Sequence, residues 1–195
     1  MLNKEELKKI SQLKGETRGV VFQTDAKYVL MKEGEKGLKK LEEKSEELGF
    51  KIPYQTAKSL DWEPLGLRIV SLLLIKDTFN LSDSEIREMG YFAPKVSFII
   101  KLLMKYFVSI KKTIENVPRY WAQHHTVGEI IVDKADEEQK EIIVRMKTPE
   151  FHPIFYTYLE GYYERIARFT NPNMVCQHSK TIIGGESFHI YKIKW

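Results

Sequence analysis

The sequence has a single cysteine, Cys176, so no disulfide bond can form within the chain. Long apolar runs are also absent, because the most apolar window, residues 96–108, is interrupted by lysines and is too short to span a bilayer. The first ten residues are charged and lack the apolar core of a secretory signal. We therefore expect a soluble, cytoplasmic protein with no membrane span.

Several motifs of catalysis and metal binding are missing as well. No glycine-rich phosphate loop follows a strand, and neither HExxH nor CxxC occurs, which excludes metallopeptidase and zinc-ribbon chemistry. The paired glycines at 184 and 185 are typical of a hairpin turn, and Cys176 is not part of a recognisable nucleophile motif. These absences favour a protein that is not an enzyme.

Charge of one sign is in small excess only. The 31 basic and 27 acidic residues give a net charge of +4, and the lysines alternate with glutamates, so we expect no nucleic-acid partner. The sequence is 43% hydrophobic and 12% aromatic, which is enough for a sizeable core.

The first half of the sequence predicts helices with one short extended stretch. Residues 18–24 are expected to be extended, and Gly34 and Gly37 to interrupt a charged helix that ends near Leu48. Ser82 and Glu85 have capping-box spacing, and Gly90 is expected to end that helix. The predicted helices cover residues 3–14, 25–31, 37–48, 65–79 and 82–90.

The second half changes character. A helix opened by Pro94 is apolar around most of its circumference and is predicted to be the central, buried helix. After a segment interrupted by Pro118, the pattern predicts a hairpin, a helix and a second hairpin. The fold class is therefore α+β: N-terminal helices plus a small antiparallel sheet, arranged hairpin–helix–hairpin, enclosing an apolar pocket. We expect one ligand-binding domain over residues 1–195, with a helical part at 1–90 and a core at 91–195.

The helix between the two hairpins is rich in aromatic residues. It begins near Pro153, and its apolar side chains recur at three- and four-residue steps on one face. Gly161 lies in its interior, where glycine costs about 1 kcal/mol relative to alanine. Close approach of another backbone or of a ligand would explain that residue.

Two helices rich in large apolar side chains, facing a small sheet, favour a binding pocket over a catalytic site. A simply filled core is the alternative, and the sequence does not decide between them. The candidate ligand-binding residues are Phe98, Leu102, Phe107, Trp121, Phe155, Tyr158, Leu159 and Tyr162.

Histidines offer weaker candidates. A two-residue turn would place Cys176, His178 and His189 on one face, where they could hold zinc, although a fourth ligand is not evident and an ordinary core is the main interpretation. His152, beside Pro153, is the candidate axial ligand if haem binds, and a capping role is the alternative. Adjacent histidines such as His124 and His125 point in different directions on a helix and favour placement at a helix C-terminus over chelation.

The C-terminal half resembles a known family. The segments 158–164 ("YLEGYYE") and 185–191 ("GESFHIY") resemble the vinyl-4-reductase-type domain over roughly residues 90–195. That domain is grouped by fold with haem–nitric-oxide-binding domains and with subunits of the TRAPP transport particle. Residues 14–48 loosely resemble the start of the haem–nitric-oxide-binding domains. The resemblance implies a ligand-binding domain whose guest lies between helices and sheet.

Departures from the motifs of these families restrict the kinds of guest that the resemblance implies. The zinc-ligand positions of vinyl-4-reductase-type domains correspond to His178, Thr181, His189 and Phe155, so most of that ligand set is missing. Residues 146–150 lack the Tyr-x-Ser-x-Arg motif of haem-binding members, and residues 104–110 lack their proximal histidine. The resemblance therefore disfavours haem and retains an acyl chain or another small apolar guest.

We expect a soluble small-molecule-binding sensor or carrier domain that holds a fatty acid or another lipid-like or aromatic molecule. The alternatives are a haem-based nitric-oxide or gas sensor using His152 or His124, and a scaffold or dimerisation protein. An enzyme of tetrapyrrole metabolism is suggested by the family name alone. No metal is expected as a fixed component, and a signalling protein or a second copy of the chain is the candidate partner.

Overall fold

The computed structural model describes residues 2–103 and 109–195. The helices are α1 (Lys4–Ser11), α2 (Val20–Glu47), α3 (Leu65–Thr78), α4 (Asp83–Val96), α5 (Phe98–Leu103), α6 (Ile110–His124) and α7 (Pro153–Ala167). The strands are β1 (Glu16–Arg18), β2 (Trp62–Pro64), β3 (Glu129–Asp136), β4 (Glu141–Lys147), β5 (Val175–Ile183) and β6 (Glu186–Lys194).

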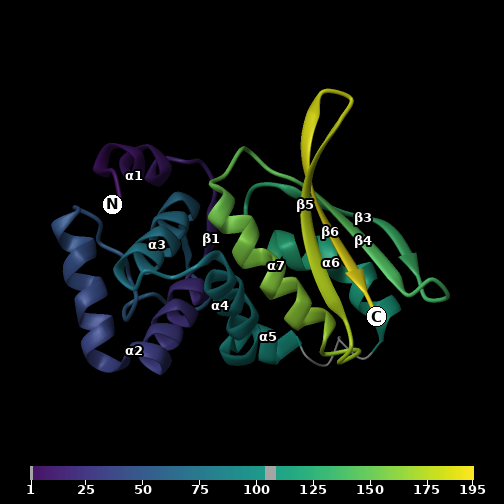
Figure 1. Ribbon diagram of the computed structural model, residues 1–195, viewed down its shortest axis with the longest axis horizontal. Coiled ribbons are helices and arrows are strands. Elements are labelled where there is room, and N and C mark those ends of the chain that lie inside the picture. Colours follow the sequence, from purple (N-terminus) through teal and green to yellow (C-terminus); the bar gives the residue numbers. More distant parts are fainter. Residues whose placement is uncertain (1, 104–108) are drawn as a thin grey trace.

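The molecule is elongated, with α1, α2 and α3 at one end and the larger sheet at the other (Figure 1). Helix α7 lies between these two parts, and the β5–β6 hairpin projects beyond the body. The larger sheet is antiparallel with strand order β3-β4-β6-β5, while β1 and β2 form a separate pair. The predicted α+β class, with two hairpins flanking a helix, is confirmed.

The two faces of the larger sheet differ in burial. The inner face carries buried side chains from the four strands, including Ile130, Val144, Tyr191 and Cys176. The outer face carries ion pairs such as Arg145 with Asp133, whose Nη2–Oδ1 distance is 2.8 Å. Alternation of burial along each strand thus turns one face of the sheet toward the helices.

Three predictions of element type in the N-terminal half were wrong. Residues 20–24, expected to be extended, begin α2, because the extended segment ends at Arg18 in a pairing with β2. The predicted interruption of this helix, by contrast, is confirmed as a kink at Gly34, where φ is +68° and ψ is −171°. Gly90 and Pro94 lie inside α4, so neither residue marks the helix boundary that the sequence suggested.

The expected central helix at residues 94–109 is also not as predicted. Helix α4 ends at Val96, Ser97 is extended (φ −68°, ψ 124°), and the short helix α5 follows. The long buried helix of the molecule is instead α3, most of whose side chains are buried, including Leu72, Leu74 and Ile75 at 0% exposure.

Helices α4 and α7 cross at two glycines. A Cβ atom at Gly161 would lie 1.9 Å from the carbonyl oxygen of Arg87, and one at Gly90 would lie 1.9 Å from the carbonyl oxygen of Tyr158. Both distances are far below van der Waals contact, so the two backbones touch where each helix lacks a side chain. Of the two explanations offered by the sequence for Gly161, close approach of another backbone is the one observed.

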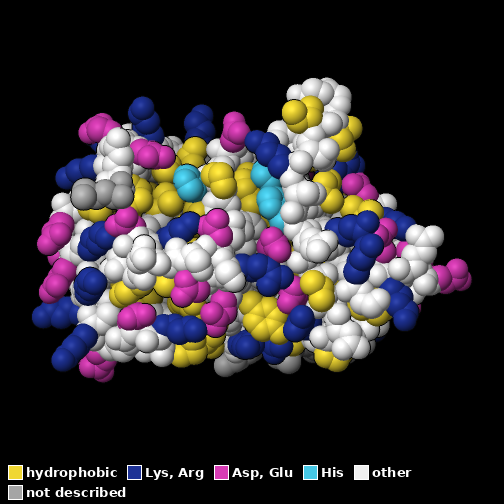
Figure 2. Space-filling model, viewed as in Figure 1, with side chains coloured by type: hydrophobic (Ala, Val, Ile, Leu, Met, Phe, Trp, Pro, Cys, Tyr) yellow, Lys and Arg dark blue, Asp and Glu magenta, His cyan; other side chains and the backbone are white. Residues whose placement is uncertain are grey.

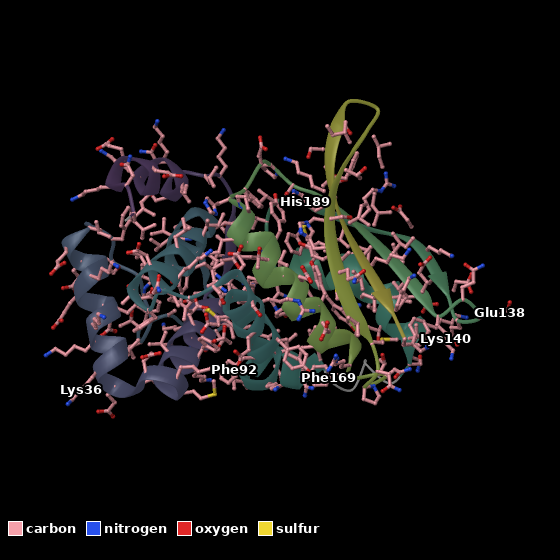
Figure 3. The ribbon with its side chains drawn as sticks, viewed as in Figure 1. Lys36, Phe92, Glu138, Lys140, Phe169 and His189 are labelled. Carbon is pink, nitrogen blue, oxygen red and sulfur yellow. The ribbon has the colours of Figure 1, made fainter. Side chains whose placement is uncertain are left out.

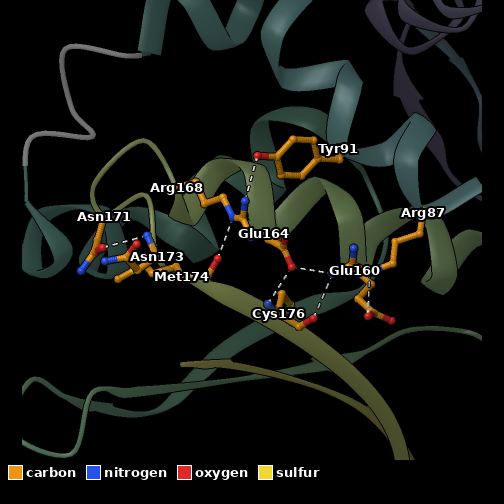
Figure 4. A network of polar contacts seen from close by, with 9 residues as sticks. All are labelled: Arg87, Tyr91, Glu160, Glu164, Arg168, Asn171, Asn173, Met174 and Cys176. Atoms are coloured by element: carbon orange, nitrogen blue, oxygen red, sulfur yellow. Dashed lines mark hydrogen bonds and ion pairs between the residues drawn. The ribbon is translucent and has the colours of Figure 1, made fainter. Parts of the chain in front are cut away.

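An ion-pair network holds the same crossing together (Figure 4). Glu164 of α7 is buried, and its carboxylate accepts hydrogen bonds from Arg87 of α4 and from the backbone N–H of Cys176 at 3.0 Å. Arg168 forms an ion pair with the second oxygen of Glu164 at 3.0 Å. Arg87 also contacts Glu160 at 2.9 Å, so α4, α7 and β5 are joined around one buried carboxylate.

Candidate functional site

A cavity of about 140 Å³ lies among α2, α3, α4, α5, α6, α7 and the inner face of the larger sheet. Its volume is close to the roughly 150 Å³ that admits a benzene ring in an engineered protein core. Most of its lining is aliphatic or aromatic, with contributions from Ala93, Ile100, Val117, Ile142, Val144 and Met174. Among the described residues that line it there is no carboxylate and no thiol.

The structure brings five of the eight predicted ligand-binding residues together. Trp121, Phe155, Tyr158, Leu159 and Tyr162 all line the cavity. Trp121 lies near the C-terminal end of α6, and the other four lie along one face of α7. Among the described residues, a pocket therefore lies between the helices and the sheet, as the sequence predicted.

The other three predicted residues are not placed there. Phe98 and Leu102 are 50% and 55% exposed and do not line the cavity. They are four residues apart on the short helix α5, so both side chains occupy its solvent face. Phe107 lies outside the described residues.

Trp121 is held rigidly at the cavity wall. Its indole Nε1–H donates to the carbonyl oxygens of Val127 at 3.0 Å and Gly128 at 3.1 Å. The ring is 7% exposed and stacks on His125 with a centroid separation of 4.0 Å. His125 in turn meets Phe155 edge to face at 6.1 Å, so a fixed aromatic wall connects α6 to α7.

Both histidines at the end of α6 line the cavity; the sequence offered His124 only as the ligand of a haem-based alternative and did not predict His125 there. The Nδ1 atom of His124 lies 2.9 Å from the carbonyl oxygen of Tyr120, and because a carbonyl only accepts, Nδ1 carries the proton. His124 Nε2 and His125 Nδ1 are buried without a hydrogen-bond partner among the described residues. Burial lowers the pKa of His124 and lowers the pKa of His125 well below its usual range, so both imidazoles are neutral at pH 7.

A buried ion pair adjoins the cavity. Arg68 of α3 lines the cavity at 1% exposure, and its Nη1 contacts Oδ2 of the fully buried Asp25 on α2. Ser71 donates to the same carboxylate oxygen at 2.8 Å. The Arg68 guanidinium lies 4.5 Å from the ring centroid of Tyr158, which also lines the cavity. Burial raises the pKa of Asp25 to about 6, although Arg68 and Ser71 act in the opposite direction.

The zinc candidates lie on another part of the sheet. His178 Nε2 and His189 Nδ1 are 2.8 Å apart, and the His189 ring stacks on Tyr156 at a centroid separation of 3.3 Å. Figure 3 places His189 near the point where the β5–β6 hairpin leaves the body. In Figure 2, histidine side chains reach the same surface beside apolar side chains. Within the described ranges, no three His, Cys, Asp or Glu side chains are arranged to hold a metal ion.

Cys176 and His152 have structural surroundings. The Cys176 thiol is buried, and burial together with Glu160 and Glu164 raises its pKa above the usual range. His152 is the N-cap of α7, where its Nδ1 accepts from the backbone N–H of Ile154 at 3.2 Å. His152 does not line the cavity, so the capping alternative describes it.

In the described part of the chain, no helix is both long and apolar enough to cross a membrane. No protein-family model matches the sequence, and no curated protein does either.

Solved structures do match the fold. One is an oxygen-binding H-NOX domain related to soluble guanylate cyclases, with a TM-score of 0.62 and 14% identity over 91% of this chain and 94% of that one. A triple variant of an H-NOX protein from S. oneidensis in the Fe(II) ligation state matches with a TM-score of 0.67 and 13% identity, covering 91% and 95%. A variant of the T. tengcongensis H-NOX protein matches with a TM-score of 0.65 and 14% identity, covering 91% and 96%. The resemblance to haem–nitric-oxide-binding domains is thus confirmed at the level of fold, and the chain has an H-NOX-like α+β fold.

Proposed function

We propose that this protein is a small-molecule-binding domain, a sensor or carrier, whose cavity holds one compact hydrophobic guest such as an aromatic ring or a short acyl chain. The observation that supports this most directly is the void itself. Large side chains that could collapse into it are held in place, as Trp121 is at the cavity wall by its two hydrogen bonds to backbone carbonyls. A cavity of about 140 Å³ in an otherwise dense core leaves its lining without partner atoms, and a guest would restore those contacts.

The expected affinity follows from the area that a guest would bury. A ring with a two-carbon arm has eight carbon atoms, worth about 6 kcal/mol at roughly 0.8 kcal/mol per carbon. Association entropy consumes much of this, so we expect a Kd in the millimolar range or weaker for a guest without specific polar contacts. Tighter binding requires polar groups in the guest that match those in the wall.

Binding, and not catalysis, is the function that the wall supports. Acid–base or nucleophilic catalysis needs a titratable or nucleophilic group within reach of the guest, and the described lining offers two neutral histidines without a carboxylate beside them. We therefore propose no reaction at this site.

A titration of 2-phenylethanol into the protein, followed by calorimetry, tests the proposal. Ala93→Leu adds three carbon atoms to the cavity wall and is expected to weaken binding at least tenfold. Ala135→Leu on β3 makes the same change at an exposed position and is the matched control, expected to bind as the wild type does. Equal binding by all three proteins, or none by the wild type, would reject the cavity as a guest site.

A haem gas sensor is the second candidate, and one observation favours it. His124 presents an unprotonated, unpartnered Nε2 at the cavity, with its Nδ1–H held by a carbonyl, which is the arrangement that metal-binding histidines adopt. The size of the cavity argues against haem, because its volume of about 140 Å³ matches one benzene ring, whereas a porphyrin has four pyrrole rings. The residues present therefore do not fit haem. We expect no Soret band after loading with haem, and a stable band that His124→Ala removes would contradict this.

A further inference from the structure

In the ion pair beside the cavity, each side chain uses only one of its terminal atoms: one guanidinium nitrogen contacts one carboxylate oxygen. Arg68 engages Asp25 through Nη1 and Oδ2 only, and Ser71 shares that same oxygen. Arg68 Nη2 and Asp25 Oδ1 are both buried without a hydrogen-bond partner among the described residues. A guanidinium normally uses its planar fork to bind two oxygens at once. Apart from the Tyr158 side chain, which lies against the guanidinium, the second half of the fork therefore meets no acceptor among the described residues.

Other polar atoms of the wall are also unmatched. His125 Nδ1 and the hydroxyl of Tyr163 are buried without a partner among the described residues, and both side chains line the cavity with Arg68. A buried polar group without a partner is unfavourable unless a ligand or an ordered water satisfies it. The wall thus offers Arg68 Nη2 and the Tyr163 hydroxyl as donors, and His125 as a third when its proton is on Nδ1.

We propose that the guest carries a single carboxylate, which accepts a hydrogen bond from Arg68 Nη2 while its apolar part packs against Trp121 and Phe155. This rests on the proposed function, because it names the chemical class of the guest in the same cavity. The Tyr163 hydroxyl and His125 are further unpartnered polar groups of the cavity wall.

Charge limits the guest to a monoanion. Asp25 already balances the charge on Arg68, so every negative charge on the guest is uncompensated in this buried site; a dianion such as a phosphate monoester would bring two such charges, whereas a carboxylate brings one. A neutral guest would leave Arg68 Nη2 without an acceptor unless it supplied a carbonyl or hydroxyl oxygen. The carboxylate supplies an acceptor with charge, which strengthens the hydrogen bond.

Calorimetric titrations with three matched probes test this. Phenylacetate, its methyl ester and 2-phenylethanol share the ring and the two-carbon arm, and only the first is charged. We expect phenylacetate to bind about tenfold tighter than either neutral probe, because a hydrogen bond to a charged partner is stronger than a neutral one. Equal affinity for the three probes would overturn the carboxylate assignment and leave the proposed function standing. Absence of binding by all three would overturn both.

A paired substitution identifies the anchor. Arg68→Met together with Asp25→Leu replaces the buried pair with apolar groups and avoids leaving one charge alone. The double variant should lose the preference for phenylacetate and keep its affinity for 2-phenylethanol. A preference that persists in this variant would overturn the role of Arg68. Should the variant not fold, the three-probe comparison on the wild-type protein still decides whether the guest is a carboxylate.

Discussion

Replacing Gly161 by alanine tests the helix crossing that positions the cavity wall. The sign of the change in stability distinguishes a glycine at an exposed helix position from one in close contact with another backbone. In an exposed helix interior, glycine to alanine stabilises by about 1 kcal/mol. Here the new Cβ would lie 1.9 Å from the carbonyl oxygen of Arg87, so α4 and α7 must separate. A backbone atom cannot move aside as a flexible side chain can, and overpacking of a core costs about 1–3 kcal/mol or more.

Because backbone must move, we take the upper end of that cost, and subtracting the gain of about 1 kcal/mol leaves a net loss of about 2 kcal/mol in the free energy of unfolding. For a chain of 195 residues this corresponds to a fall in Tm of roughly 4–8 °C. Urea unfolding followed by circular dichroism measures it, with Thr157→Ala, four residues earlier on α7, as the control expected to change stability by less than about 0.5 kcal/mol. A Gly161→Ala protein as stable as the wild type, or more stable, would refute the close backbone contact.

Three further predictions follow from buried polar groups. Glu164→Gln should destabilise the fold by about 3 kcal/mol in urea unfolding, because Arg87 and Arg168 lose their shared carboxylate, whereas Glu186→Gln on the surface should have little effect. Burial lowers the pKa of His189 to about 4, so as pH falls from 6.5 to 4 the unfolded chain binds a proton before the folded one, and the stability of the fold should decline. In thermal melts, His189→Gln should make this decline with pH less steep. An unchanged dependence of Tm on pH would contradict the lowered pKa of His189. The Cys176 thiol, buried and with a raised pKa, should react with a disulfide reagent only after unfolding, and rapid reaction of the native protein would contradict its burial.

The sequence predicted most of the fold because its local signals agree with the packing. The capping box of Ser82 and Glu85 and the turn at Gly184 both occur where expected. Each of these is a local interaction, which a short segment specifies without the rest of the chain.

The errors came from interactions that are distant in sequence. Gly90 was taken for a helix end, whereas it meets Tyr158 of another helix. Phe98 was placed in a buried face because α5 was read as part of one long helix, although the chain turns at Ser97. A helical periodicity does not reveal which neighbour covers each face, so these positions needed the three-dimensional structure.

The site was predicted in its aromatic part and missed in its polar part. Aromatic spacing along α7 identified Phe155, Tyr158 and Tyr162, because one helix face is visible in a periodic pattern. Arg68 lies within an apolar run that indicates a buried helix. A charged residue at such a position is visible in the sequence and could have identified Arg68 as a candidate site residue. Its partner Asp25 is 43 residues away, which no local pattern discloses.

The most direct test of the central claim is a crystal structure of the protein grown with 2-phenylethanol. We predict electron density for one ring enclosed by Trp121, Phe155 and Tyr158, with those side chains in the positions described here. A structure in which these side chains fill the space themselves, with no ring density between them, would contradict the claim that this fold keeps a vacancy for a guest.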